Sequence, residues 1–212
     1  MLELYFLRHG QTALSRENMF CGSGTDAPLT SGGEEMSRQF ADYYKTDNWK
    51  AIFCSPLGRT RSTAETIATS KQMKPLVRDE LIEISYGKWE SKTVEEVEKL
   101  YHDEHLSWSA DPAWYPPTDG ESATSVAARA LQVIEEIRKE YTDGKVLIVS
   151  HKATIRIAFC ALLGIDVGRY RYRLACPVGS LSIVEFGEHG PLIERIGDRA
   201  HLDEHLRNLE GT

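Results

Sequence analysis

Five side chains in this 212-residue chain have types and positions suited to binding and transferring a phosphoryl group. They are two arginines, two histidines and one glutamate: Arg8, His9, Arg59, Glu83 and His151. Guanidinium groups match phosphoryl oxygens bidentately and keep their charge at any working pH. A neutral imidazole can attack phosphorus in line, and a nearby carboxyl can protonate the leaving oxygen and then deprotonate water. These residue types therefore predict phosphoryl chemistry through a phosphohistidine.

The elements that must position these groups are strands that end at one edge of a sheet. Leu2 to Leu7 is a bulky, nearly uninterrupted apolar run, which predicts a strand buried on both faces of a mostly parallel sheet. Arg8 and His9 follow it directly, and His151 follows the run Val146 to Val149 in the same way. Open α/β sheets bind ligands at the carboxyl edge of their strands, so we expect these groups to meet there, with helix amino termini adding partial positive charge. A lone Arg-His pair would be read as a capped strand, and the repetition along the chain favours a site.

The remaining pattern alternates helices with short strands. We expect a helix over 30–45 that covers the sheet with Met36, Phe40, Tyr43 and Tyr44, and a helix after residue 54 with Ser55 as its N-cap. In the proline-broken loop 111–119, two aromatic residues could line a pocket mouth or pin the loop, and pinning is favoured. Further helices are expected over 93–100, 121–141 and 152–163. Strands are expected over 51–54, 76–77, 181–186 and 192–196, and the last two should form a hairpin at one edge of the sheet. The segments 15–28 and 81–90 are expected to be loops.

Composition narrows the class of protein. A chain of 212 residues with 41% hydrophobic content can bury its core as a single domain spanning residues 1–212. A net charge of −7 argues against nucleic acid and anionic membrane as partners. The four cysteines form no CxxC pair, and the amino terminus lacks the plan of a secretory signal, so we expect a reduced, cytoplasmic protein.

Six motifs in order give the chain a marked resemblance to a known family. They are RHGQT from Arg8, GTDAPLTSGGEE from Gly24, SPLGRTRSTAE from Ser55, LIEISYGKWE from Leu81, GES from Gly120 and SHKATIR from Ser150. Together they resemble the histidine phosphatase superfamily, also called phosphoglycerate mutase-like proteins, almost end to end. The resemblance implies a three-layer α/β/α fold with a mixed, mostly parallel sheet of about six strands and no metal or cofactor. It also implies that His9 is the nucleophile, that Arg8, Arg59 and His151 clamp the phosphate, and that Glu83 donates the proton.

Departures from the family pattern fall where the substrate would bind. Ser15 replaces a common asparagine, and its hydroxyl could still contact the phosphoryl group; Met19 and Cys21 replace a common arginine and glutamine. Lys152 stands where small residues are usual, and it either faces the pocket or reaches outward from the first helical turn. The candidate substrate-binding residues are Ser15, Cys21, Gly22, Ser23, Tyr86 and Lys152.

The predicted function is hydrolysis of a small phosphorylated metabolite. The resemblance leans to bacterial small-metabolite phosphatases, including metal-independent phosphoserine phosphatases, and leaves sugar phosphates, sugar bisphosphates and α-ribazole phosphate open. A phosphoglycerate mutase is the alternative, although the mutases that this chain resembles carry an added basic segment that it lacks. A homodimer is also left open.

Two pairs of histidines allow a less favoured interpretation, in which they bind a metal ion. His102 with His105, and His201 with His205, lie among carboxylates at spacings that a metal site would use, but solvated acidic helices give the same pattern. His201 is the exception, because a near-terminal histidine in this family can approach the pocket. A metallohydrolase therefore ranks low, and a nonenzymatic module that binds phosphorylated ligands ranks lower, because binding alone would not need Glu83.

Overall fold

A six-stranded mixed sheet forms the centre of the structure, a computed structural model that describes residues 1–211. The strand order is β3-β2-β4-β1-β5-β6. β1 pairs in parallel with β4, which pairs in parallel with β2, and β2 pairs in parallel with β3, while β5 and β6 add antiparallel strands beyond β1. The strands are β1 Leu2–Arg8, β2 Trp49–Cys54, β3 Leu76–Val77, β4 Gly144–Ser150, β5 Leu181–Gly187 and β6 Gly190–Asp198. The mixed sheet and its edge hairpin agree with the prediction.

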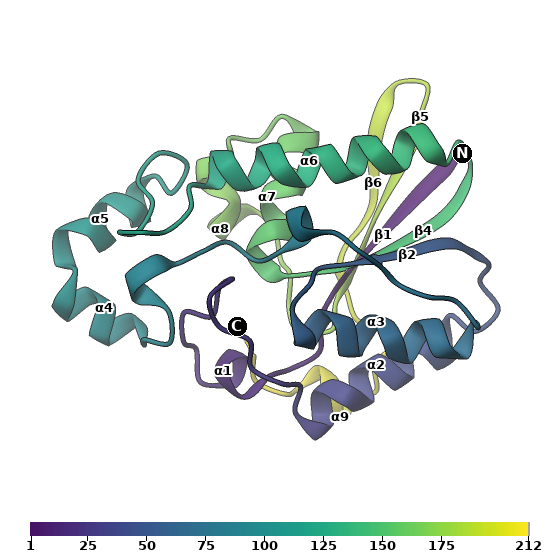
Figure 1. Cartoon of the computed structure of the whole chain (residues 1–212), viewed down its shortest axis with the longest axis horizontal. Coiled ribbons are helices and arrows are strands. Elements are labelled where there is room, and N and C mark those ends of the chain that lie inside the picture. The colour runs from purple at the N-terminus through teal and green to yellow at the C-terminus, as the bar shows by residue number, and fades with distance from the viewer. Residues whose placement is uncertain (212) are drawn as a thin grey trace.

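Helices cover both faces of the sheet, as Figure 1 shows. α2 (Ser31–Tyr43) and α3 (Gly58–Ser70) pack on one face, and α6 (Ala123–Glu140) and α7 (Lys152–Leu163) pack on the other. This confirms the three-layer α/β/α fold.

The apolar run of β1 divides its side chains between these two layers. Leu4 and Phe6 point into the core beneath α6 and α7, whereas Tyr5 and Leu7 point into the core beneath α2 and α3. Successive strand side chains face opposite sides, so a strand covered on both faces needs apolar residues at every position. The near-continuous hydrophobicity of this segment is therefore explained by its place in the middle of the sheet.

A helical excursion between β3 and α6 forms a second, smaller core. α4 (Val94–Leu100) and α5 (His102–Ala110) extend away from the sheet (Figure 1). Beneath them Trp89 and Trp108 pack edge to face at 5.2 Å between ring centroids, and Phe20 joins them from the segment after β1. α4 was expected from the sequence, and for α5 the sequence indicated an acidic helix around His102 and His105 but neither its bounds nor its packing. The other short elements are α1 Ala13–Arg16, α8 Tyr170–Arg173, α9 Glu204–Arg207 and the 3₁₀ turns η1 Asp79–Leu81, η2 Gly87–Trp89 and η3 Val167–Arg169.

Three local expectations differ from the structure. α3 begins at Gly58, because Leu57 is extended and its backbone N–H donates to the Ser55 hydroxyl, so Ser55 forms a turn and is not the N-cap. Tyr43 is exposed, since the apolar face of α2 ends at Phe40 and Tyr44. Trp114 and Tyr115 do not pin their loop, because they are 72% and 56% exposed. No helix within residues 1–211 is both long and apolar enough to span a bilayer.

Candidate active site

The register of the parallel strands brings three strand ends together. Arg8, the last residue of β1, pairs with Ser150, the last residue of β4. The backbone N–H of His9 donates to the Ser150 carbonyl at 3.1 Å, and that of Ser55 donates to the Val149 carbonyl at 3.2 Å. His9 and His151 therefore lie side by side, with ring centroids 5.2 Å apart. The predicted convergence at the carboxyl edge is present.

His9 is a buried, neutral imidazole. Its Nδ1 lies 2.8 Å from the Gly10 carbonyl oxygen, which can only accept, so Nδ1 carries the proton and Nε2 keeps its lone pair. Burial, together with the guanidinium groups of Arg59 and Arg8, holds the pKa of His9 well below its usual value. A neutral ring with a free lone pair on Nε2 is chemically able to act as a nucleophile.

The turn after His9 is fixed by close packing against α2. A Cβ on Gly10 would lie 2.2 Å from the Gly33 carbonyl oxygen, and a Cβ on Gly33 would lie 2.2 Å from the Gln11 carbonyl oxygen. Two glycines therefore let the backbone segments touch. This contact holds the histidine-bearing turn rigidly against the first turn of α2.

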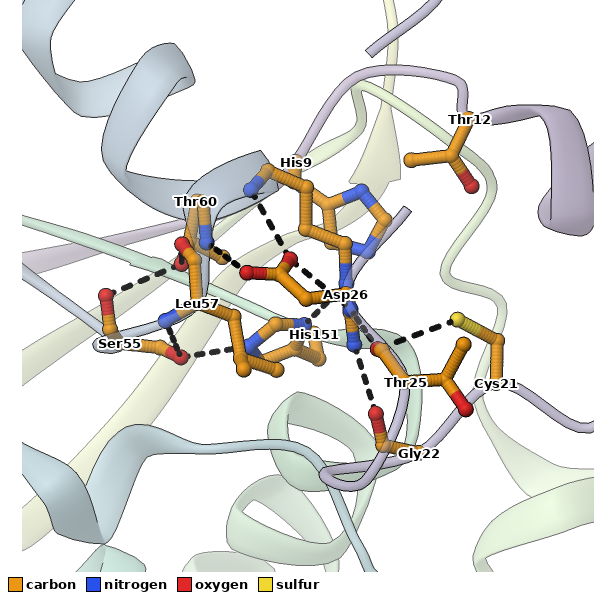
Figure 2. Close-up of polar contacts among 12 residues, drawn as sticks. His9, Thr12, Cys21, Gly22, Thr25, Asp26, Ser55, Leu57, Thr60 and His151 are labelled. Carbon is orange, nitrogen blue, oxygen red and sulfur yellow. Dashed lines mark hydrogen bonds and ion pairs between the residues drawn. The ribbon is translucent and has the colours of Figure 1, made fainter. Parts of the chain in front are cut away.

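Arg59 is held in place on several sides. It donates from its terminal nitrogens to the carbonyls of Thr25 at 2.6 Å and Gly22 at 3.1 Å, and it pairs with Asp26 at 3.5 Å. Its Nε donates to His151 Nδ1 at 3.3 Å. The 21–26 loop thus orients this guanidinium. Figure 2 labels Gly22, Thr25 and Asp26 of this loop.

His151 is hydrogen-bonded to Arg59. The ring is fully buried, accepts at Nδ1 from Arg59, and contacts the Ser55 hydroxyl through Nε2 at 2.7 Å (Figure 2). Burial, with Arg59 and His9 nearby, holds the pKa of His151 well below its usual value. A neutral ring that accepts at Nδ1 must donate from Nε2–H to Ser55. In this arrangement His151 orients Arg59, and a direct contact with phosphate stays a prediction.

Arg8 and Glu83 complete the expected set on the opposite wall. Arg8 donates from one terminal nitrogen to the Cys176 carbonyl at 2.8 Å and is almost fully buried. Glu83 accepts from the backbone N–H groups of Ile84 at 2.9 Å, Ala153 at 3.1 Å and Thr154 at 3.0 Å, and from the Thr154 hydroxyl at 3.1 Å. These donors hold the carboxyl group of Glu83 in one orientation beside the pocket.

The helix amino termini contribute differently from the expectation. Glu83 occupies the amino terminus of α7, and Asp26 occupies that of α3, where it accepts from the backbone N–H of Gly58 at 2.7 Å. Both termini are thus satisfied by carboxylates of the chain itself. The donors for a phosphate must then come from side chains, chiefly the arginines.

A pocket of about 160 Å³ opens above these groups. Of the predicted residues, those that line it are Arg8, His9, Ser15, Cys21, Arg59, Glu83, Tyr86 and Lys152. His151, Gly22 and Ser23 do not line it within the described chain.

Contacts below the pocket explain several of these placements. Gly22 donates from its backbone N–H to Glu90 at 2.9 Å, and Ser23 donates to the Ile84 carbonyl at 3.2 Å, so both hold the loop in place. The Ser15 hydroxyl takes part in a capping box with Thr12 at the start of α1.

Other lining residues were not expected from the sequence. Arg156 and Arg171 add two cations, and Phe20, Trp108 and Tyr170 add aromatic walls. Arg156 follows Lys152 by four residues on α7, so helical periodicity could have placed it on the same face. Arg171 and Trp108 have no such signal, because α8 and α5 reach the pocket only through tertiary packing.

The histidine pairs lie elsewhere. His105 packs beside Trp89 and Trp108, and His201 is buried with Nε2 at 2.9 Å from the Gly179 carbonyl, where burial lowers its pKa to about 4. Within residues 1–211 no three His, Cys, Asp or Glu side chains are grouped closely enough to hold a metal ion.

Comparisons with known proteins agree with this architecture. A model of the histidine phosphatase superfamily (branch 1) matches residues 4–199. The chain is 30% identical to phosphoserine phosphatase 1 of Hydrogenobacter thermophilus over 96% of both chains, and 30% identical to a probable phosphoglycerate mutase of Escherichia coli over 96% of both.

A solved structure shares the same fold. The phosphoserine phosphatase of Entamoeba histolytica, solved in complex with 3-phosphoglyceric acid, superposes with a TM-score of 0.81 at 26% identity, covering 95% of this chain and 99% of that one. With a family match over nearly its whole length, the chain belongs to the histidine phosphatase superfamily (branch 1) and is a phosphatase of that family.

Proposed function

We propose that this phosphatase hydrolyses small phosphate monoesters through a phosphohistidine formed on Nε2 of His9. The observation that carries the proposal is the bond between His9 Nδ1 and the Gly10 carbonyl at 2.8 Å, because it fixes the tautomer with a lone pair on Nε2. Arg8 and Arg59 line the same pocket and supply permanent positive charge for the incoming phosphoryl group.

In the first step, a bond forms between His9 Nε2 and phosphorus while the bond from phosphorus to the ester oxygen breaks. The departing alkoxide takes its proton from the Glu83 carboxyl. The arginines stabilise the charge on the phosphoryl oxygens as it shifts.

In the second step, water attacks phosphorus and the bond to Nε2 breaks. Glu83, now a carboxylate, accepts the proton from the water. Its hydrogen bonds from Ala153 and Thr154 suit this step, since they orient the carboxylate beside the pocket. Inorganic phosphate leaves and His9 returns to its neutral state.

The substrate proposed is a small phosphorylated metabolite: phosphoserine, a sugar phosphate or a sugar bisphosphate. The pocket of about 160 Å³ suits a small ligand, and the Hydrogenobacter relative is named a phosphoserine phosphatase. Cys21, Tyr86 and Lys152 line the pocket and are the substrate-binding candidates that we retain from the sequence. The four cysteines are all free, which suits the proposed cytoplasmic setting.

The test is a screen of purified protein against a panel of phosphorylated metabolites, with excess chelator present and phosphate release measured. We expect turnover with the wild type and none with His9→Ala. Release of phosphate only after addition of magnesium or zinc would contradict the proposal. Interconversion of phosphoglycerates faster than phosphate release would favour the mutase instead.

A further inference from the structure

Two arginines of the pocket have no role in the proposed phosphoryl transfer. Arg156 lies on α7, one turn beyond Lys152, and Arg171 lies on α8. Both line the pocket that contains Arg8 and His9. They are half-buried side chains on a wall that a bound substrate would face.

Each of these guanidinium groups is fixed by contacts with protein. Arg156 donates from one terminal nitrogen to the Arg171 backbone carbonyl. The Arg171 guanidinium carbon lies 3.9 Å from the centroid of the Trp108 ring. The two groups are therefore held in a definite position.

Each group also keeps a buried donor without a partner in residues 1–211. Nε of Arg156 and one terminal nitrogen of Arg171 are out of contact with solvent and make no hydrogen bond there. Buried polar groups in folded proteins are nearly always hydrogen-bonded, so each of these guanidinium groups keeps hydrogen-bonding capacity that its protein neighbours do not use. An anionic acceptor matches them best, because charge-assisted bonds to guanidinium are strong.

The charge of the side chains that line the pocket also favours an anionic ligand. Five cationic side chains face one carboxylate: Arg8, Arg59, Lys152, Arg156 and Arg171 against Glu83. Lys152 and Arg156 stand four residues apart on one helix, where like charges repel. Burial, followed by Arg8 and Arg156, lowers the pKa of Lys152 to about 8. One phosphoryl group at Arg8 and Arg59 would leave Lys152, Arg156 and Arg171 facing the single carboxylate of Glu83.

We propose that Arg156 and Arg171, with Lys152, form a subsite for a second anionic group of the substrate, a carboxylate or a second phosphate. The inference rests on the proposed function, since it assumes that the transferred phosphoryl group lies at His9. It narrows the substrate class to small phosphate monoesters whose other end is also anionic. Trp108 and Tyr170 line the same pocket and restrict it to a short molecule.

The test uses two matched pairs of substrates. 3-Phosphoglycerate and glycerol 3-phosphate differ by a carboxylate, and fructose bisphosphate and fructose monophosphate differ by a phosphate. We expect the wild type to prefer the more anionic member of at least one pair by about tenfold in kcat/KM, equivalent to about 1.4 kcal/mol. The pair that shows the preference identifies the anion.

Arg156→Gln and Arg171→Gln should each reduce that preference to about threefold or less, because the neutral amide cannot replace the guanidinium charge. Arg171→Lys keeps the charge without the fork and should restore part of the preference. Arg173→Gln is the matched control, since Arg173 is an exposed arginine of the same helix that does not line the pocket in the described chain. If the Arg156 variant does not fold, as judged by thermal melting, the Arg171 variants decide the question.

The proposal is overturned if the wild type hydrolyses p-nitrophenyl phosphate but discriminates within neither pair, or if both Gln variants keep the full preference. Failure of the wild type to hydrolyse any ester would instead reject the proposed function. The two failures are therefore distinguishable.

Discussion

Arg59 donates from Nε to Nδ1 of His151 at 3.3 Å, so the second histidine of the site is bound to the arginine that would hold the phosphate. Ser55 fixes the other ring nitrogen at 2.7 Å. A histidine ring whose two nitrogens are both hydrogen-bonded to protein groups is suited to positioning Arg59. The strand end at Ser55 and the strand end before His151 are thus coupled to the phosphate site through one guanidinium.

His151→Ala should weaken phosphate binding through Arg59. We expect the inhibition constant of inorganic phosphate to rise by about tenfold, because the Nε–H of Arg59 loses its acceptor. The measurement is a double-mutant cycle with Arg59→Gln. Strong non-additivity is expected, whereas additive losses would show that His151 acts on the substrate independently of Arg59.

Glu83→Gln should affect esters according to their leaving group. Poor leaving groups need a proton, so an alkyl phosphate should slow by about 10²-fold or more while an activated aryl phosphate slows much less. The measurement is kcat for both esters with wild type and variant. Equal losses on the two substrates would remove Glu83 from the role of proton donor.

Substitution of the two adjacent glycines in the first turn of α2 should have unequal consequences. Alanine normally stabilises a helix relative to glycine. A Cβ on Gly33, however, would lie 2.2 Å from the Gln11 backbone carbonyl, whereas a Cβ on Gly32 meets only the movable end of the Leu209 side chain, at 2.7 Å. We expect Gly33→Ala to lower the free energy of unfolding by about 2 kcal/mol and Gly32→Ala to change it by less than about 0.5 kcal/mol.

Urea unfolding of both variants checks this prediction. Gly33→Ala should also reduce turnover, because the strained contact is next to the turn that carries His9. Equal stability of the two variants would show that the turn can move away from α2 without penalty.

The binding of doubly anionic substrates should weaken at alkaline pH. Burial and the nearby arginines lower the pKa of Lys152 to about 8, so its ammonium is charged below that pH and neutral above it. Substrate phosphates titrate near pH 6, outside this range. We expect kcat/KM for the anionic member of a substrate pair to fall relative to its less anionic partner as pH rises through 8.

Lys152→Met is the matched comparison. The ratio of its kcat/KM values for the two substrates should not change with pH in that range. A wild-type ratio that stays constant between about pH 7 and pH 9.5 would show that Lys152 does not contact the second anion.

The central sheet could be predicted because its strands are buried on both faces. In β1, Leu4, Phe6 and their neighbours form a nearly continuous apolar run without polar residues in alternation, which is typical of a strand buried on both faces. The same holds for Val146 to Val149 in β4. Short elements could not be predicted in this way. α5 carries charged residues around a single fully buried residue, Trp108, and its position depends on an aromatic cluster formed by distant segments.

The convergence of the five candidate residues was predictable for a different reason: each follows a strand or lies in a recognisable motif. Their catalytic roles stay predictions. Arg171 has no such context, and only the packing of α8 and α5 places it beside the pocket. The positions of the two carboxylates at the helix amino termini could not be predicted either, because Asp26 and Glu83 reach α3 and α7 from loops that are distant in the sequence. The single-domain boundary and the homodimer stay predictions.

The most direct test of the account is chemical trapping of the phosphoenzyme. Rapid acid-free quenching after mixing with a radiolabelled substrate should yield protein-bound phosphate that is labile in acid and stable in base, located by peptide mapping on His9. The variant His9→Ala should carry none, while Gly32→Ala, which leaves the site intact, should label as the wild type does. Equal labelling of the His9→Ala variant, or label found on another residue, would contradict the assignment of His9 as nucleophile.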